Sequence, residues 1–222
     1  MSRPSPPLIG AGRAADVFDL GDGTVLRRYR TDHDSAHEAR LMQWLHSVGY
    51  PVPRVHRANG RDLVMDRIEG PTMLDDMSRR PWRLRRNVRL LVDLQRTLGE
   101  LSAPDWLITS PGVPAGDAVL HLDLHPGNVL LSANGPVVID WPNASRGPAG
   151  FDAALTHVLL STSQVRRHER VAQLLVVAFF SRGQDPDYAH HMAAAIQRRL
   201  LDRNITARER ASLLRHLERI GR

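Results

Sequence analysis

The stretch from His121 to Trp141, HLDLHPGNVLLSANGPVVIDW, constrains the fold of this chain more than any other segment. Asp123 stands five residues before Asn128, and two short apolar runs separated by a turn then lead to Asp140. The pattern predicts a loop and two short strands that present three oxygen-bearing side chains. One can act as a base toward a hydroxyl, and two can hold a divalent cation. Phosphoryl transfer needs such an arrangement, because its catalysis is mostly positioning and neutralisation of phosphate charge.

The side chains of this stretch can be given separate roles. Asp123 is the candidate base, since a loop carboxylate can accept the proton of a hydroxyl and orient it. Asn128 and Asp140 are the candidate Mg²⁺ ligands, because Mg²⁺ takes one or two protein oxygens and completes its shell with phosphates and waters. His121 is expected to hold the loop backbone, and His125 to support the loop or contact substrate. The alternative is that the Asp and Asn side chains only cap turns and helices.

Length and composition set the broad class. The chain has 222 residues, room for one large domain or two small lobes, and its 42% hydrophobic and 24% charged content is ordinary for a globular protein. It has no Cys, which excludes disulfides, thiolate metal sites and Cys nucleophiles. No apolar run approaches the ~20 residues of a membrane span, and the first residues lack the apolar core of a signal peptide. We therefore expect a cytoplasmic protein without a membrane partner.

The basic balance of the chain comes from one residue type. The formal net charge is +6, and all 30 Lys and Arg residues are Arg. A phosphate contact made by a long cationic side chain must therefore use the guanidinium fork of Arg. A basic chain can also indicate a nucleic-acid surface. We expect no nucleic-acid partner, because the Arg residues are interleaved with acids and no nucleic-acid-binding motif is present.

The first third of the chain has the pattern of strands with one helix. Alternating residues predict two antiparallel strands around a Gly-Asp-Gly turn, and a second hairpin turning at Asn59-Gly60. A helix between them can be capped by an Asp and ends at a Gly. The predicted elements are strands at 8–20 and 24–30, a helix from Asp32 or Asp34 to Gly49, and a hairpin over 55–70.

Beyond a linker near residues 66–72 the pattern becomes mostly helical. Helices are predicted at 81–101, 151–162, 165–182, 187–203 and 206–220, with a loop at 103–118. We therefore expect a small strand-rich lobe, residues 1–68, and a larger helical lobe, residues 69–222, that carries the chemistry. Clefts between lobes are common ligand sites.

Two features of the strand-rich lobe can serve phosphate binding. Gly10 and Gly12 can let backbone amides approach phosphates, although a third Gly is missing and a plain tight turn is the alternative. Arg13 in the same loop can contact phosphate or face solvent. These residues are therefore candidates for phosphate binding.

Arg27 is expected to pair with Glu38. Strand alternation places Arg27 on the same face as Val25 and Tyr29. Glu38 lies on the apolar stripe of the predicted helix, and a buried carboxylate needs a partner. We expect Arg27 to bond Glu38 and also to reach nucleotide phosphates. The alternative is that both are solvated and Arg28 makes the phosphate contact.

The motif His121-x-Asp123-x-x-x-x-Asn128, followed by Val-Val-Ile-Asp140-Trp, resembles the aminoglycoside phosphotransferase and choline kinase families. The resemblance implies an α+β, bilobal protein-kinase-like fold with a small antiparallel-sheet N-lobe and a larger helical C-lobe. It also implies that Asp123 is the catalytic base, that Asn128 and Asp140 bind Mg²⁺, and that ATP is the co-substrate.

The resemblance implies roles for further residues. The chain also departs from the family pattern in three respects. Backbone groups of Met65, Asp66 and Ile68 would hold the nucleotide base, and Asp152 would brace the lobe. The departures are Leu122 in place of Gly, Arg27 in place of the nucleotide-contacting Lys, and a helical lobe that is short for the family. The short lobe is where acceptors usually bind.

The leading hypothesis is ATP- and Mg²⁺-dependent transfer of the γ-phosphoryl group to a hydroxyl of a small molecule. Residues 151–222 hold twelve Arg and seven acids, which favours a neutral or anionic acceptor, unless these Arg side chains lie on solvated faces. One alternative is a catalytically silent nucleotide-binding module. Another is a protein kinase, although no long segment after Asp140 is available as a peptide platform. ATP and GTP are not distinguished.

Overall fold

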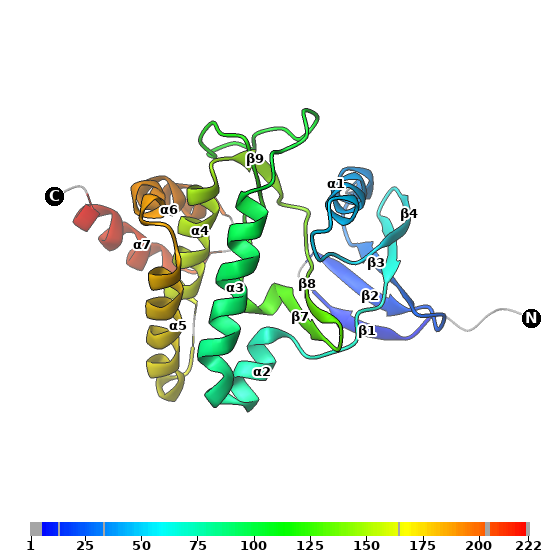
Figure 1. The fold of residues 1–222 in the computed structure, drawn as a ribbon, viewed down its shortest axis with the longest axis horizontal. Helices are drawn as coiled ribbons and strands as arrows, with labels where there is room; N and C mark the ends of the chain where they lie inside the picture. Colours follow the sequence, from blue (N-terminus) through cyan, green and yellow to red (C-terminus); the bar gives the residue numbers. More distant parts are fainter. Residues whose placement is uncertain (1–5, 13, 33, 164, 203–204, 221–222) are drawn as a thin grey trace, which may run out of the picture. The chain divides into compact units, whose positions relative to one another are not determined.

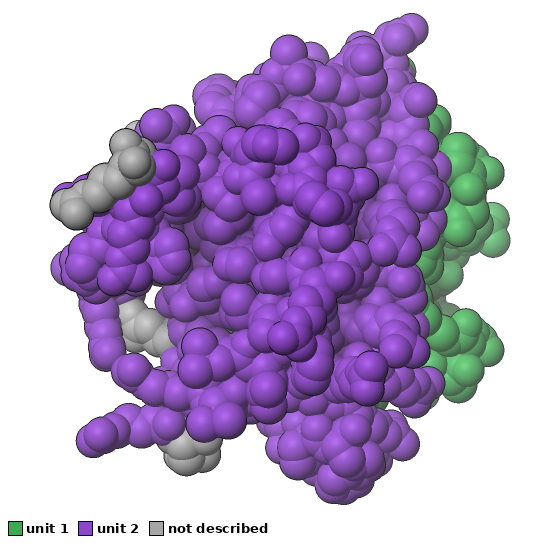
Figure 2. Space-filling model, turned by 60° about the vertical axis from the view of Figure 1, so that its left-hand side comes forward, with its two compact units in different colours: residues 1–71, 130–142 green, residues 72–129, 143–222 purple. Residues whose placement is uncertain are grey.

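A computed structural model of the chain describes residues 6–12, 14–32, 34–163, 165–202 and 205–220. Arg13, one of the phosphate candidates, lies outside these residues. The chain forms two compact units, coloured green and purple in Figure 2. Unit 1 comprises the chain up to Pro71 together with residues 130–142, and unit 2 comprises residues 72–129 and 143–222.

Unit 1 is built on a five-stranded antiparallel sheet with the order β1-β2-β3-β5-β4. Helix α1 (Ser35–Ser47) is capped by Asp34, whose side chain accepts the N–H of Ala36, so one of the two predicted caps is used. The predicted hairpin turn at Asn59-Gly60 is also present. The strands are β1 (Leu8–Ala11), β2 (Ala15–Asp19), β3 (Thr24–Tyr29), β4 (Val55–Asn59) and β5 (Asp62–Asp66).

The first predicted strand is two strands in the structure. The backbone N–H of Gly12 donates to the carbonyl of Ala15 at 2.9 Å, and Ala11 pairs with Asp16. This tight turn folds β1 back onto β2. The prediction of one strand over residues 8–20 was therefore wrong, because the alternating pattern continues through the turn and hides it.

Residues 130–142 return to unit 1, although the sequence-based division after Ile68 placed them with the helical lobe. They include most of the hairpin β7 (Val129–Ser132) and β8 (Gly135–Val138). The N–H groups of Leu131 and Val138 donate to the carbonyls of Pro71 and Pro51. Gly70 permits this packing, because a Cβ there would lie 2.2 Å from the carbonyl oxygen of Leu131.

Unit 2 is helical, and its centre is α4. Residues Phe151 to Leu160 of α4 are buried with the exception of His157, which is half-buried. Figure 1 shows α3 and α5 running side by side, and both contact α4. The helices are α2 (Met73–Arg79), α3 (Leu84–Gly99), α4 (Ala149–Thr162), α5 (Arg170–Gly183), α6 (Met192–Leu200) and α7 (Ala207–Ile220).

The remaining elements of unit 2 are short. Strands β6 (Ala118–Leu120) and β9 (Ser145–Gly147) form an antiparallel pair. The described residues also include four 3₁₀ segments, three of which begin with Pro. These segments are η1 (Pro81–Arg83), η2 (Pro126–Asn128), η3 (Arg167–Glu169) and η4 (Pro186–His191). Among the helices that the structure describes, none has the length and apolar character needed to cross a membrane.

Candidate active site

The loop after β6, residues 121–128, is held at its start by hydrogen bonds to the carboxylate of Asp152 in α4. Asp152 is 1% exposed and accepts the backbone N–H groups of His121 at 3.0 Å and Leu122 at 2.7 Å. Its Oδ2 also accepts the side-chain amide of Gln95 in α3 at 2.8 Å. A buried carboxylate that accepts three N–H groups fixes the start of the loop. These contacts fit the bracing role expected for Asp152.

Both histidines of the loop bond its backbone. His121 is fully buried, and its Nδ1 accepts the N–H of Asp123 at 3.2 Å. Nδ1 of His125 accepts the N–H of Gly127 at 3.0 Å and caps η2. The predicted loop-holding contact of His121 is confirmed, and His125 supports the loop as well.

Leu122 takes a backbone conformation that usually belongs to glycine. Its φ is +63°, in the left-handed region, which costs an ordinary residue about 1–2 kcal/mol. Its side chain packs in the core of unit 2 with Leu120, Phe151 and Leu155. Full burial of a Leu side chain contributes about 1.5–3 kcal/mol, which offsets the backbone strain. The departure from Gly at this position is therefore accommodated by the core.

The loop brings Asp123 and Asn128 together. Nδ2 of Asn128 donates to the backbone carbonyl of Asp123 at 2.9 Å and lies 3.5 Å from its Oδ2. This orientation of the amide leaves Oδ1 of Asn128 as the atom that can ligate a cation. The Asp123 side chain is 31% exposed, so a substrate hydroxyl can reach it.

Asp140 belongs to unit 1 and lies beyond the end of its strand. Strand β8 ends at Val138, so the prediction of Asp140 at the tip of a strand is off by two residues. The backbone turns at Asp140 with a φ of +72°. Its side chain is 37% exposed and forms an ion pair with Nη2 of Arg27. The left-handed turn, which Asp tolerates better than most residues, presents this carboxylate at the surface of unit 1.

The predicted pair between Arg27 and Glu38 is confirmed. Nη1 of Arg27 lies 2.9 Å from Oε1 of Glu38, and both side chains are buried. Burial alone would lower the pKa of Arg27, but the charges of Glu38 and Asp140 outweigh burial and raise that pKa. Arg27 therefore stays cationic. Because Arg27 and Glu38 are both buried, the alternative that both are solvated is wrong. Arg28 lies on the opposite, exposed face of the strand and pairs with Asp62 at 2.6 Å.

Tyr29 and Gln95 were not singled out from the sequence as site residues. The Tyr29 hydroxyl donates to Oε2 of Glu38, and Gln95 bonds Asp152. Strand alternation placed Tyr29 beside Arg27, but it could not show where the hydroxyl points. Gln95 could have been noticed as a polar residue on the apolar side of a predicted helix.

The remaining nucleotide candidates lie along the sheet of unit 1. Gly10 pairs with Val17 across β1 and β2, and Gly12 stands at the turn that follows. Met65 is buried in β5, and Ile68 follows that strand half-buried.

The neighbouring Asp66 already uses two of its polar groups. Its N–H donates to the carbonyl of Arg54 at 2.9 Å, and its carboxylate lies 2.6 Å from Nε2 of His56. A nucleotide contact through the backbone of Asp66 would therefore use its carbonyl oxygen.

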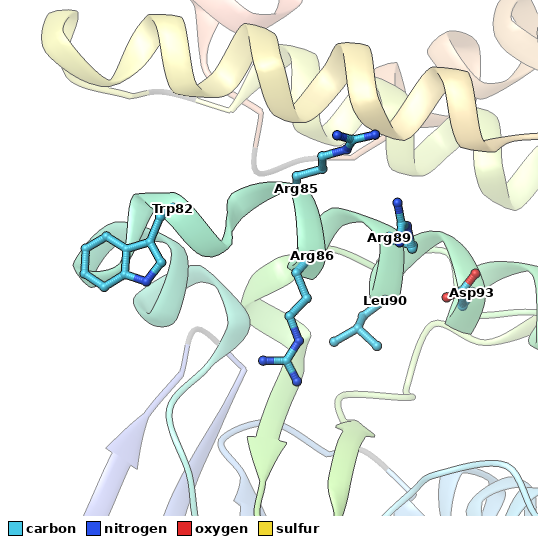
Figure 3. Close-up of a pocket in the computed structure, with 6 residues that line it drawn as sticks. All are labelled: Trp82, Arg85, Arg86, Arg89, Leu90 and Asp93. Atoms are coloured by element: carbon cyan, nitrogen blue, oxygen red, sulfur yellow. The ribbon is translucent and has the colours of Figure 1, made fainter.

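A hollow of about 430 Å³ lies on the exposed side of η1 and α3 in unit 2. Figure 3 shows Trp82 at one end of the row of lining residues and Asp93 at the other. The hollow carries three guanidinium groups and one carboxylate, so it attracts anions more than cations. No predicted site residue lines it. The lining residues are Trp82, Arg85, Arg86, Arg89, Leu90 and Asp93.

Comparison with known proteins identifies the family. The model of the phosphotransferase enzyme family matches residues 7–113 and 111–190. The chain belongs to the phosphotransferase enzyme family. The match covers most of the chain, including the loop with Asp123 and Asn128 and the segment with Asp140. No curated protein sequence matches the chain.

Solved structures with the same fold include three phosphotransferases. A ternary complex of APH(2″)-IIa with streptomycin and ATP has a TM-score of 0.62 and 12% identity, over 96% of this chain and 91% of the other. Choline kinase from Cryptosporidium parvum has a TM-score of 0.59 and 12% identity, over 97% and 88%. The amicoumacin kinase hAmiN, in complex with AMP-PNP, Ca²⁺ and Ami, has a TM-score of 0.56 and 14% identity, over 97% and 87%.

These likenesses establish the fold of the chain. An antiparallel sheet of five strands precedes a helical region, as in the aminoglycoside phosphotransferases and choline kinase. The predicted α+β kinase-like fold is therefore confirmed, and so is the resemblance on which it rested. Identities of 12–14% carry no information about the substrate.

Proposed function

We propose that this phosphotransferase moves the γ-phosphoryl group of ATP to a hydroxyl of a small molecule, with Mg²⁺. The observation that carries the proposal is the loop of unit 2, which fixes Asp123 and Asn128 side by side on a backbone held by Asp152 and two histidines. Phosphoryl transfer depends on such positioning. The solved relatives include complexes with streptomycin and ATP and with AMP-PNP.

Asp123 is proposed to orient the acceptor and take its proton. A bond forms between the acceptor oxygen and the γ-phosphorus, the bond from that phosphorus to the β–γ bridging oxygen breaks, and ADP leaves. The proton of the hydroxyl passes to the carboxylate of Asp123. Such proton transfer typically contributes 10²–10⁴-fold in rate. The partial exposure of Asp123 suits this role, because a fully buried carboxylate could not reach a bound hydroxyl.

Asn128 and Asp140 are proposed as the Mg²⁺ ligands. Both offer hard oxygen atoms, which Mg²⁺ prefers, and two protein ligands leave room for phosphates and waters. Among the described residues no group of three or more His, Cys, Asp or Glu side chains is placed to hold a metal, so Mg²⁺ would depend on this Asn and Asp. When bound, Mg²⁺ would neutralise phosphate charge. Within the chain, Asn128 is oriented by Asp123, and Asp140 is paired with Arg27.

The nucleotide is proposed to lie against unit 1. Arg27 would contact its phosphates in place of a Lys, braced by Glu38. The backbone at Gly10 and Gly12 would admit the phosphates, and that of Met65, Asp66 and Ile68 would hold the base. An arginine neutralises phosphate as well as a lysine does, but it does so through a planar fork, so its direction matters more.

The acceptor is proposed to be neutral or anionic. Residues 151–222 carry twelve Arg and seven acids, and the hollow on α3 is also basic. A polycationic aminoglycoside would meet repulsion there. We expect kanamycin to be a poor substrate of the purified protein when ATP consumption is followed with Mg²⁺ present. Efficient ATP-dependent modification of kanamycin would contradict this proposal about the acceptor and leave the transfer reaction intact.

Thermal unfolding with Mg²⁺ and nucleotide tests the proposed function directly. At a nucleotide concentration of about 100 Kd, the expected rise in Tm is roughly 5–10 °C. Nucleotide without Mg²⁺ is the control and is expected to give a smaller rise. ATP and GTP are compared side by side. No shift with either nucleotide contradicts the proposal. A shift without transfer to any acceptor would favour a silent nucleotide-binding module, for which the replacement of Lys by Arg27 is the supporting observation.

A further inference from the structure

Both carboxylate oxygens of Glu38 are engaged in unit 1. Oε1 accepts Nη1 of Arg27 at 2.9 Å and the backbone N–H of Trp141 at 3.2 Å. Oε2 accepts the hydroxyl of Tyr29. Glu38 and Tyr29 are each 2% exposed, so this network is shielded from water. The second amino group of Arg27, Nη2, points to Asp140 instead of Glu38.

The two terminal nitrogens of the Arg27 guanidinium bond different carboxylates. Arg and carboxylate groups commonly form two parallel hydrogen bonds, one from each side of the fork. Here the fork is split between two carboxylates, and Oε2 of Glu38, the oxygen that would accept the second bond from Arg27, accepts the hydroxyl of Tyr29 instead. The hydroxyl of Tyr29 therefore competes with Nη2 of Arg27 for Oε2 of Glu38.

We propose that Tyr29 is a positioning residue that makes Arg27 act on phosphate as a lysine would. By competing for Oε2 of Glu38, its hydroxyl favours an Arg27–Glu38 contact through Nη1 alone and leaves Nη2 directed toward Asp140 and the nucleotide phosphates. The inference rests on the proposed function, because it assigns Arg27 to the nucleotide. Lysine carries a single point of charge and would need no such restraint.

The aromatic ring of Tyr29 supports the same geometry. The Arg27 guanidinium carbon lies 4.9 Å from the ring centroid, within the range of a cation–π contact. Arg27 and Tyr29 are two apart on β3, so the ring and the guanidinium share one face of the sheet. Burial, together with the charge of Glu38, raises the pKa of Tyr29, so its hydroxyl keeps its proton and remains a donor.

A double-mutant cycle separates this role from a merely structural one. Tyr29→Phe keeps the ring and removes only the hydroxyl, and Arg27→Lys removes the fork. The Kd for ADP with Mg²⁺ is measured by calorimetry for the wild type, both single variants and the double variant. We expect Tyr29→Phe to weaken binding roughly tenfold when residue 27 is Arg, and by less than about twofold when it is Lys. Equal losses in the two backgrounds would overturn the inference.

Tyr50→Phe is a matched control. It removes a hydroxyl from an equally buried tyrosine of unit 1, and its effect on Kd should not depend on residue 27. A wild-type protein that binds no nucleotide would contradict the proposed function itself, which is a different outcome from equal losses in the cycle.

A crystal structure of Tyr29→Phe without nucleotide gives a readout independent of binding. Nη2 of Arg27 is expected to move to the freed Oε2 of Glu38 and to leave Asp140. An unchanged Arg27 that still bonds Asp140 through Nη2 would overturn the inference.

Discussion

Replacing Asp123 with Asn is expected to lower kcat for phosphoryl transfer by a factor of about 10²–10⁴. The affinity for the Mg²⁺-nucleotide should stay essentially unchanged, because Asp123 is proposed to touch the acceptor and not the nucleotide. The measurement is steady-state transfer with an identified acceptor, together with the Kd of ADP. Once an acceptor has been found, a kcat equal to that of the wild type would refute the role of Asp123.

The Asn variant leaves the loop around Asp123 intact. Asn128 bonds the backbone carbonyl of Asp123, and His121 bonds its backbone N–H, so neither contact depends on the side chain that changes. Asp117→Asn is a suitable control, since its side chain is 81% exposed in the same unit and pairs with Arg146. Its kcat should equal that of the wild type.

Replacing Asp152 with Ala is expected to destabilise unit 2 by about 3–5 kcal/mol. The change leaves the N–H groups of His121 and Leu122 and the amide of Gln95 without their acceptor. Each unsatisfied buried donor costs about 1–3 kcal/mol, and relaxation of the loop recovers part of the sum. Urea unfolding should show the loss, and transfer activity should fall with it because the loop loses its support.

Two further variants make this result interpretable. Asp152→Asn keeps one carbonyl oxygen as an acceptor and should lose less stability than the Ala variant. Asp93→Ala removes an exposed carboxylate from α3 and should change the free energy of unfolding by less than about 0.5 kcal/mol. An Asp152→Ala protein as stable as the wild type would show that the three hydrogen bonds contribute nothing net.

The Arg27–Glu38 pair shows what could be predicted from sequence. A polar residue on the buried face of a strand and another on the apolar stripe of the next helix must satisfy each other, since a lone buried charge is too costly. The residue periodicity of the strand and of the helix, together with the opposite charges of Arg27 and Glu38, therefore identified both partners. That Asp123 and Asn128 lie together followed from their spacing within one loop, because local geometry depends little on the rest of the fold.

Features that depend on side-chain direction or on very short elements could not be predicted. Strands β6 and β9 have three residues each, too few for an alternating pattern to be recognised. The turn at Gly12 interrupts a continuous strand pattern. The left-handed backbone of Asp140 precedes Trp141, whose N–H bonds Glu38, 103 residues away in the sequence. Asp152 was identified only through the family resemblance, since an Asp near the start of a helix is common.

The return of residues 130–142 to unit 1 imposes an order on folding during translation. Trp141 is 1% exposed, contacts Tyr50 edge to face, and bonds Glu38 across 103 residues of chain. A nascent chain that ends at Pro71 therefore lacks part of the core around its own sheet. At about 5–20 residues per second, the ribosome needs several seconds more to supply the missing hairpin. During that interval the Arg27–Glu38 pair lacks the segment whose Trp141 bonds Glu38. Unit 1 therefore completes its fold only after residues 72–129 of unit 2 have been synthesised.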